Sequence, residues 1–197
     1  MIVKRKLILA SSSPRRRRLL KQLGLEFEVR ESGVDEERDV PNDPDLHVRI
    51  LSERKAVAVA AEEEEGIVIG ADTIVVLDGA IMGKPKDPRH AVAMLARLSG
   101  RTHDVYSGFT LLDRATNKKK TAVEVTKVSF RHLTLQEIEE YVASGSPLDK
   151  AGAYGIQDDY GAVFVERIDG CFYNVVGFPL SRFYTELQQF QKELGLH

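Results

Sequence analysis

The chain has 197 residues, of which 43% are hydrophobic and 29% are charged, and these proportions exclude a disordered protein. Its formal net charge of -2 excludes the global positive field that holds nucleic acid. A single cysteine, Cys171, excludes a disulfide framework and a cysteine-rich zinc site. No stretch approaches the roughly 20 apolar residues of a membrane span, and the first ten residues lack the long apolar segment of a signal peptide. We therefore expect a cytoplasmic protein that binds neither membranes nor, stably, nucleic acid.

The first part of the chain predicts strands and helices in turn. A short buried strand is expected at Lys6–Ala10. Ser13-Pro14 then opens a helix, because serine caps helices and proline suits the first helical position, and this helix ends at Gly24. A strand at Phe27–Arg30 follows, and Asp43-Pro44 begins a second helix.

The middle of the chain predicts a hairpin and a third helix. Two runs rich in strand-forming residues lie at Ile67–Ile69 and Thr73–Leu77. Asp78-Gly79 is a strong signal for a tight hairpin turn after them. Asp87-Pro88 then opens a helix that reaches Leu98.

Two long strands are expected next, around Thr102–Asp113 and Lys120–Arg131. Thr134 and Glu137 have the spacing of a capping box and predict a helix that runs to Ala143.

The last part of the chain predicts a strand pair, at Ala162–Ile168 and Phe172–Val176, and an amphipathic helix from Pro179 to about Leu194. Strands mixed with helices indicate an α/β fold, and the middle hairpin makes its sheet mixed rather than purely parallel. We expect a single domain over residues 1–197.

The segment Ala10–Arg18 carries three serines and four arginines where a strand ends and a helix begins. Helix N-termini bind phosphate through free N–H groups, and arginine adds paired donors. The alternative is a solvated basic first turn, but cations at a helix N-terminus are unfavourable, and such local conflicts occur mainly at functional sites. We expect Arg15 and Arg16 to face a ligand and Arg17 and Arg18 to be solvated.

Asp72 follows the apolar run Ile67–Ile69, which predicts a carboxylate at a buried strand end. A carboxylate there can hold Mg²⁺ or accept a proton from water, although a turn aspartate that caps its own backbone remains an equal alternative. Lys84 lies between glycine and proline and could reach a phosphate, although an ordinary surface turn is the simpler interpretation.

Four further features are weaker alone. In the glycine-containing segment Asp149–Gln157, Lys150 could pair with phosphate and Gln157 with a base edge, but the spacing alone slightly favours a flexible loop with incidental polar groups. The acidic run at residues 35–37 could supply a second metal ligand, or be a surface turn. Lys55 could face inward, although a solvent-facing lysine is the default, and His103 is best explained as structural.

Six segments together resemble the Maf family, the septum-formation-type nucleotide pyrophosphatases, over nearly the whole chain. They occur in the family's order and spacing, at Ala10–Arg16, Gly70–Thr73, Gly83–Pro85, Leu98–His103, Asp149–Gln157 and Val176–Pro179. The resemblance implies a mixed, twisted β-sheet flanked by helices, with a central crevice between two lobes.

The resemblance also implies the reaction, which is cleavage between the α- and β-phosphates of a nucleoside triphosphate with release of pyrophosphate. Asp72 would be the proton acceptor, and Glu36 and Asp72 would help to hold a divalent cation, Mg²⁺ or Mn²⁺. The residues expected to bind the substrate are Ser11, Arg15, Arg16, Lys55, Thr73, Lys84, Lys150 and Gln157.

Three positions indicate the base. Arg15, Thr73 and Gln157 are similar to the dTTP/UTP type, whereas the 7-methyl-GTP type has a tryptophan that this chain lacks. Modified pyrimidine triphosphates are a further expected class. The turn at Asp158–Tyr160 departs from the family's shorter glycine-containing turn.

The family implies a role in cleaning nucleotide pools, a link to septum arrest, and a homodimer. Two alternatives remain open at this point. One is a non-enzymatic nucleotide-binding regulator of septum formation, which would not need the carboxylate of Asp72. The other is a nucleic-acid binder that uses Arg15–Arg18, against which the net charge of -2 argues.

Overall fold

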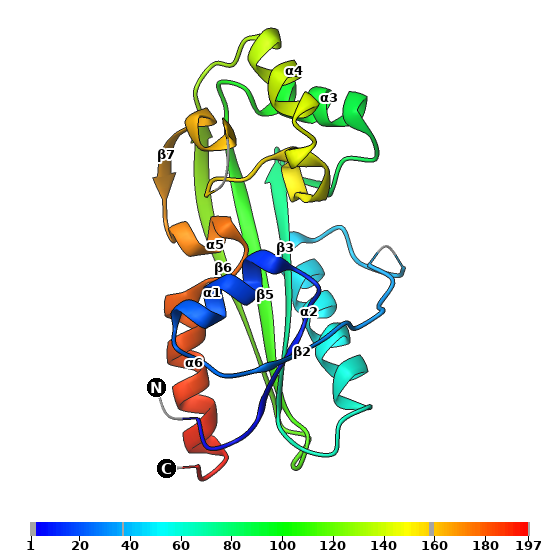
Figure 1. The fold of residues 1–197 in the computed structure, drawn as a ribbon, viewed down its shortest axis with the longest axis vertical. Helices are drawn as coiled ribbons and strands as arrows, with labels where there is room; N and C mark the ends of the chain where they lie inside the picture. Colours follow the sequence, from blue (N-terminus) through cyan, green and yellow to red (C-terminus); the bar gives the residue numbers. More distant parts are fainter. Residues whose placement is uncertain (1–2, 37, 158–159, 197) are drawn as a thin grey trace. The chain divides into compact units, whose positions relative to one another are not determined.

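A computed structural model describes residues 3–36, 38–157 and 160–196. Within these residues seven strands form one sheet in the order β2-β1-β3-β5-β6-β7, with β4 paired to β3 (Figure 1). The strands are β1 (Leu7–Ala10), β2 (Glu28–Arg30), β3 (Ile67–Leu77), β4 (Ala80–Met82), β5 (Thr102–Asp113), β6 (Lys119–Phe130) and β7 (Val165–Asp169). The pairs β1–β2 and β1–β3 are parallel, and β3–β4 and β6–β7 are antiparallel. The predicted α/β fold with a mixed sheet is confirmed.

Helices connect most of these strands. The α-helices are α1 (Pro14–Gln22), α2 (Pro44–Ala60), α3 (Pro88–Leu98), α4 (Leu135–Ala143), α5 (Phe172–Val176) and α6 (Leu180–Glu193). Three short 3₁₀ segments lie at η1 (Ser146–Asp149), η2 (Ala151–Ala153) and η3 (Tyr160–Phe164). Among the described residues, no helix combines the length and the apolar character that crossing a membrane would require.

The described chain divides into two compact units. The first unit comprises the residues up to Asp72, Ser107–Glu124 and the residues from Gly177 onward. The second unit comprises Thr73–Tyr106 and Val125–Val176. Strands β3, β5 and β6 contribute residues to both units, so neither unit is a continuous stretch of chain. The single domain and the central crevice expected from the sequence remain predictions.

In the first unit, helices α2 and α6 cover opposite faces of the sheet (Figure 1). Side chains alternate between faces along a strand, so Gly108 and Phe109 of β5 point to opposite sides. A Cβ atom on Gly108 would lie 2.5 Å from the carbonyl oxygen of Val48 in α2. The ring of Phe109 instead lies 5.6 Å from that of Phe183 in α6. The sheet of this unit is therefore buried on both faces.

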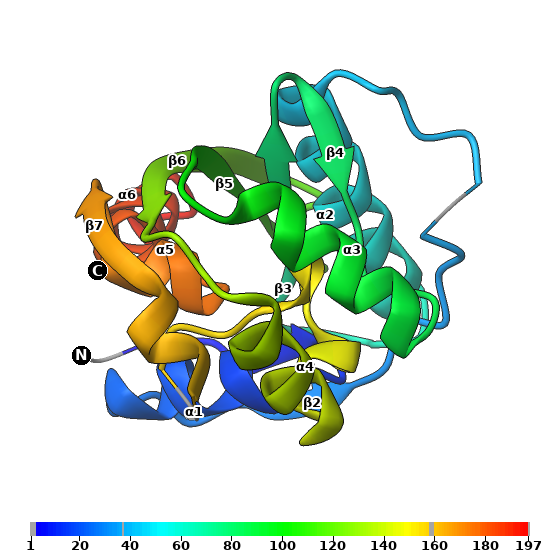
Figure 2. The same cartoon turned by 90° about the horizontal axis from the view of Figure 1, so that it is seen from above.

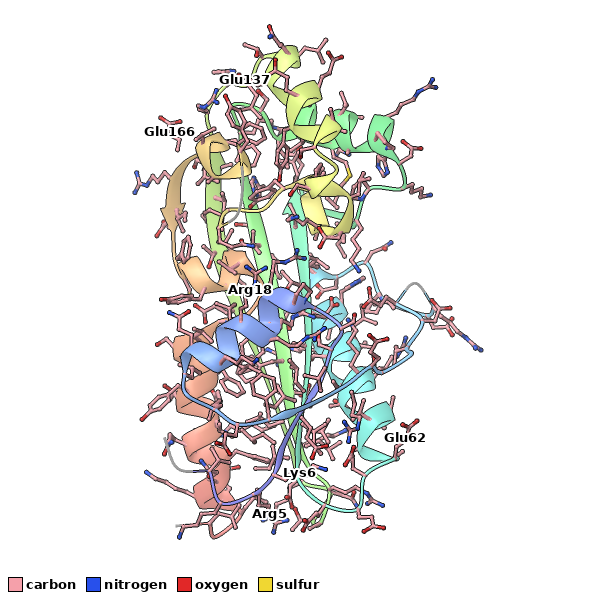
Figure 3. All side chains as sticks on the ribbon, in the orientation of Figure 1. Arg5, Lys6, Arg18, Glu62, Glu137 and Glu166 are labelled. Atoms are coloured by element: carbon pink, nitrogen blue, oxygen red, sulfur yellow. The ribbon has the colours of Figure 1, made fainter. Side chains whose placement is uncertain are left out.

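In the second unit, α3 and α4 lie side by side (Figure 2). Leu95 and Leu98 of α3 and Ile138 of α4 belong to one buried cluster. The predicted capping box at the start of α4 is confirmed: Thr134 Oγ1 accepts from the Glu137 N–H, and the Glu137 carboxylate accepts from the Thr134 N–H at 2.8 Å. Glu137, labelled in Figure 3, also accepts from Arg131 Nη2 at 2.6 Å.

The predicted hairpin between β3 and β4 is confirmed. Asp78 and Gly79 have φ values of 53° and 77°, which are the left-handed values that a two-residue turn of this kind requires. The two runs predicted before this turn are joined into one eleven-residue strand, β3, because the Gly70–Asp72 link between them stays extended.

The predicted strand at Phe172–Val176 is wrong, because these residues form helix α5. A short apolar run fits a strand and a buried helix equally well, and tertiary contacts decide between them. Here the buried Asn174 donates from Nδ2 to the Val105 carbonyl oxygen at 2.9 Å and to Thr126 Oγ1 at 3.0 Å. The other strand of the predicted pair, expected at Ala162–Ile168, is shorter than predicted, since β7 begins at Val165 after the 3₁₀ segment η3.

Candidate functional site

Serine side chains close the loop between β1 and α1 and cap the start of the helix. Ser13 is the N-cap, and its Oγ accepts from the Arg16 N–H at 3.4 Å. Ser11 is buried, with 7% of its surface exposed, and its Oγ accepts from the Ser13 N–H at 3.2 Å. The predicted cap is therefore confirmed, and the serine side chains hold the loop together.

Arg17 and Arg18 are exposed, as predicted, and Arg18 is labelled in Figure 3. Arg16 points inward, while the expectation that Arg15 and Arg16 face a ligand remains a prediction. Arg16 Nε donates to the Gly177 carbonyl oxygen at 3.1 Å, and Nη1 donates to Ser11 Oγ at 3.4 Å. Burial lowers the pKa of Arg16, and the charges of Asp72 and Glu36 oppose that shift. This guanidinium therefore lies within electrostatic reach of both carboxylates. Gly177 lies in the Val176–Pro179 segment singled out in the sequence, but its contact with Arg16 was not predicted.

Gly70 explains how Lys55 and Asp72 come together. A Cβ atom at Gly70 would lie 2.0 Å from the Ser52 carbonyl oxygen and 2.7 Å from the Ala56 nitrogen, both of them backbone atoms of α2. Only glycine allows this approach of helix to strand. Lys55 is on that helix and Asp72 is two residues beyond Gly70, so the close packing brings lysine and aspartate within bonding distance.

The prediction that Asp72 lies at the end of its own strand is wrong, because Asp72 lies inside β3. It does lie beyond the end of the neighbouring parallel strand, because β1 stops at Ala10, which pairs with Gly70. The chain of β1 turns away there into the Ser11–Ser13 loop. The carboxylate is therefore adjacent to a strand that has ended, although its own strand continues.

Lys55 bridges two carboxylates in the first unit. Its Nζ donates to Asp72 Oδ1 at 2.8 Å and lies 2.6 Å from Glu36 Oε1. The side chains of Lys55 and Asp72 are only 6% and 8% exposed, whereas that of Glu36 is 44% exposed. A buried ammonium requires such compensation, because an isolated charge in the protein interior is strongly unfavourable. The solvent-facing default for Lys55 is therefore wrong, because its ammonium faces inward to the two carboxylates. Lys55 also brings Glu36 of the acidic run close to Asp72, whereas Glu37 lies outside the described residues.

The two carboxylates fit a hard divalent cation. Asp72 Oδ2 is buried and has no hydrogen-bond partner among the residues that the structure describes. Such an oxygen is costly unless a further group satisfies it. No cluster of three or more His, Cys, Asp or Glu residues occurs in the described parts of the chain. Glu36 and Asp72 therefore match the Mg²⁺ pattern, in which one or two carboxylates act together with substrate phosphates.

Arg15 is partly buried in the first turn of α1, and the other four predicted substrate residues belong to the second unit. Thr73 and Gln157 are partly buried and Lys84 is exposed. Lys150 is 8% exposed, and its ammonium donates within its own loop, to the carbonyl oxygen and Oγ of Ser146 and to Asp149 Oδ1 at 2.9 Å. The binding roles of these four residues remain predictions. Asp158 and Asp159 of the unusual turn lie outside the described residues.

A buried pair in the second unit anchors the segment that carries Gln157. His103 Nε2 lies 2.8 Å from Tyr154 Oη, and the His103 ring meets that of Phe130 edge-on at 5.1 Å. Burial lowers the pKa of His103 to about 4, so this histidine is neutral at pH 7. Tyr141 Oη accepts from the Gly155 N–H at 3.2 Å. The structural interpretation of His103 agrees with this burial. The roles of Tyr141 and of Tyr154, which lies in the Asp149–Gln157 segment, were missed because their partners are distant in the chain.

Comparisons with known proteins agree with the six-segment resemblance. A family model described as Maf-like protein matches residues 6–190. A dTTP/UTP pyrophosphatase of Pelotomaculum thermopropionicum is 48% identical over 186 residues, which cover 94% of this chain and 97% of that protein. The dTTP/UTP pyrophosphatase of Moorella thermoacetica is 51% identical over 177 residues, 89% of this chain and 90% of its own. That of Salinibacter ruber is 50% identical over 182 residues, 92% and 89% of the two chains. The chain belongs to the Maf family.

Proposed function

We propose that this protein is a nucleoside triphosphate pyrophosphatase that hydrolyses dTTP and UTP to the monophosphate and pyrophosphate. The observation that carries the proposal is the cluster of the buried Lys55 and Asp72 with the more exposed Glu36, beside the Ser11–Arg16 loop. Relatives about half identical over almost their whole length bear the name dTTP/UTP pyrophosphatase, which supports the same substrates.

The first unit supplies the groups that such a hydrolysis needs. Arg16 and the α1 N-terminus offer donors to phosphate oxygens, and Arg15 adds a second guanidinium beside them. Glu36 and Asp72 would hold Mg²⁺ or Mn²⁺, which supplies neutralisation of the phosphate charge when bound. The water oxygen attacks the phosphorus, pyrophosphate leaves, and Asp72 accepts the proton that the water loses. Burial of Asp72 keeps this acceptor away from bulk water.

The pyrimidine preference rests on Arg15, Thr73 and Gln157 and on the absence of tryptophan. An amide such as that of Gln157 can both donate to and accept from a base edge, and the chain has no tryptophan to stack on a charged purine. Modified pyrimidine triphosphates fit the same proposal. A homodimer and a cytoplasmic location are further proposals that the family resemblance supports, and light scattering of the purified protein tests the dimer.

The decisive experiment measures pyrophosphate release with dTTP, UTP, CTP, dGTP and 7-methyl-GTP in the presence of Mg²⁺ or Mn²⁺. The Asp72→Asn variant keeps the side-chain size and removes the charge, and we expect kcat to fall by about 10²-fold or more. Asp78→Asn is the matched control, because Asp78 lies in the exposed hairpin turn, where asparagine also accepts a left-handed φ. No turnover of any of these triphosphates by the wild type would refute the proposal.

A further inference from the structure

In the structure Lys55 Nζ lies between two carboxylates that are matched to a divalent cation. It is 2.8 Å from Asp72 Oδ1 and 2.6 Å from Glu36 Oε1, so it already provides positive charge at the point where both side chains converge. We propose that the Lys55 ammonium is a resident cation that competes with the metal for these carboxylates. This inference rests on the proposed function, since that function supplies the metal.

The charges of the cluster support this competition. Asp72 and Glu36 carry one negative charge each, and Lys55 and Arg16 carry one positive charge each, so the group is close to neutral without any added ion. A divalent cation that joined it would leave a net positive charge in a largely buried place, which is unfavourable. The negative charges of a triphosphate remove that imbalance. Metal binding is therefore weak in the free protein and becomes strong when nucleotide is present.

The contacts of Lys55 also indicate which partner its ammonium takes when the metal binds. Its remaining hydrogen bond is a long one, 3.4 Å to the Ala71 carbonyl oxygen, and among the described residues the two carboxylates are its closest partners. Once the carboxylates turn to the metal, the ammonium is available to a phosphate oxygen of the nucleotide. Lys55 then changes partners during binding, and it keeps Asp72 and Glu36 together while no metal is bound.

The test is the affinity of the nucleotide-free protein for Mn²⁺, measured by calorimetry and by the EPR signal of free Mn²⁺. Lys55→Gln removes the competing charge, and we expect Mn²⁺ to bind about tenfold more tightly or better, which equals about 1.4 kcal/mol. Arg49→Gln is the control, because it removes the same charge from the same helix, where Arg49 pairs with Asp45 and not with the cluster. The Mn²⁺ affinities of Arg49→Gln and Lys55→Arg should both stay within about twofold of the wild-type affinity, far less than the tenfold change, about 1.4 kcal/mol, expected for Lys55→Gln.

A second measurement uses the wild type and so does not depend on the folding of any variant. The ¹⁵Nζ resonance of Lys55, assigned by its loss in Lys55→Arg, is followed while Mg²⁺ is added without nucleotide. The resonance should shift with the same half-saturation as the bound Mg²⁺. Saturation with Mg²⁺ while this resonance stays still, or an unchanged or weaker Mn²⁺ affinity in Lys55→Gln, would overturn the inference.

Pyrophosphate release by the wild type, measured in parallel, separates this inference from the proposed function. Turnover by the wild type without tighter Mn²⁺ binding in Lys55→Gln overturns the competition and leaves the function intact. Tighter binding in Lys55→Gln with no turnover by the wild type supports the competition and overturns the function.

Discussion

The contact between Gly70 and α2 gives a sharp test of how the site is built. Replacing Gly70 with alanine adds one methyl group that would lie 2.0 Å from the Ser52 carbonyl oxygen, 2.7 Å from the Ala56 nitrogen and 3.0 Å from Ala56 Cβ. Comfortable contacts begin at about 3.5 Å, so α2 would have to move away from β3 by about 1.5 Å to relieve the shortest one. The two closest atoms belong to a helix backbone, which cannot rotate aside as a side chain can.

The loss of stability expected for Gly70→Ala lies at the upper end of the range for added methyl groups in packed cores. Extra methyl groups in packed cores cost about 1–3 kcal/mol, and because backbone atoms obstruct this one, we expect about 3 kcal/mol or more. For a protein of this size each kcal/mol lowers Tm by roughly 2–4 °C, so the predicted decrease is roughly 6–12 °C. The same movement would separate Lys55 Nζ from Asp72 Oδ1, now 2.8 Å apart, so pyrophosphate release should fall even in the fraction that folds.

Urea unfolding followed by circular dichroism, together with thermal melting, measures the change in the free energy of unfolding. Gly83→Ala is the matched control, because no atom lies within 4 Å of the position its Cβ would take and its backbone has no left-handed φ. We expect that control to unfold within roughly 0.5 kcal/mol of the wild type. If Gly70→Ala were as stable as Gly83→Ala and kept the activity of the wild type, close packing of α2 on β3 would not be what places Lys55.

Three further predictions concern the second unit. His103 has a pKa of about 4 against an ordinary 6.5, so between these pH values the unfolded chain binds a proton at this residue that the folded chain does not. The free energy of unfolding should therefore fall by an amount on the order of 3 kcal/mol as the pH drops from 6.5 to 4. His103→Gln should remove that part of the pH dependence in urea titrations; an identical pH profile would contradict the buried neutral ring. Thr134→Ala should cost about 1 kcal/mol through loss of the α4 cap, whereas Thr134→Ser should restore most of it. The hydrogen bond from Arg131 lowers the pKa of Glu137 to about 2. The contribution of the Glu137 carboxylate to the free energy of unfolding is therefore present above pH 4.5 and is lost as the pH falls toward 2. The difference in stability between wild type and Glu137→Gln should close over that range, and a constant difference would refute this.

Local signals in the sequence predicted most of the elements correctly. The caps at Ser13 and Thr134 and the turn at Asp78-Gly79 all depend on neighbouring residues, and each occurs where it was predicted. The failure at Phe172–Val176 has the opposite cause. Its conformation depends on Asn174, whose bonding partners Val105 and Thr126 are 69 and 48 residues away in the chain.

The candidate site likewise has some features that depend on neighbouring residues and others that depend on long-range contacts. The sequence by itself determined the cap at Ser13, the exposure of Arg17 and Arg18 and, through six ordered segments, the family. Only the tertiary structure decided that Lys55 bridges Asp72 and Glu36 and that Asp72 Oδ2 is buried without a described partner. The reason is that caps and turns form between residues close in the chain, whereas this cluster depends on the packing of α2 against β3 at Gly70, a contact between segments that no periodic pattern in the sequence connects.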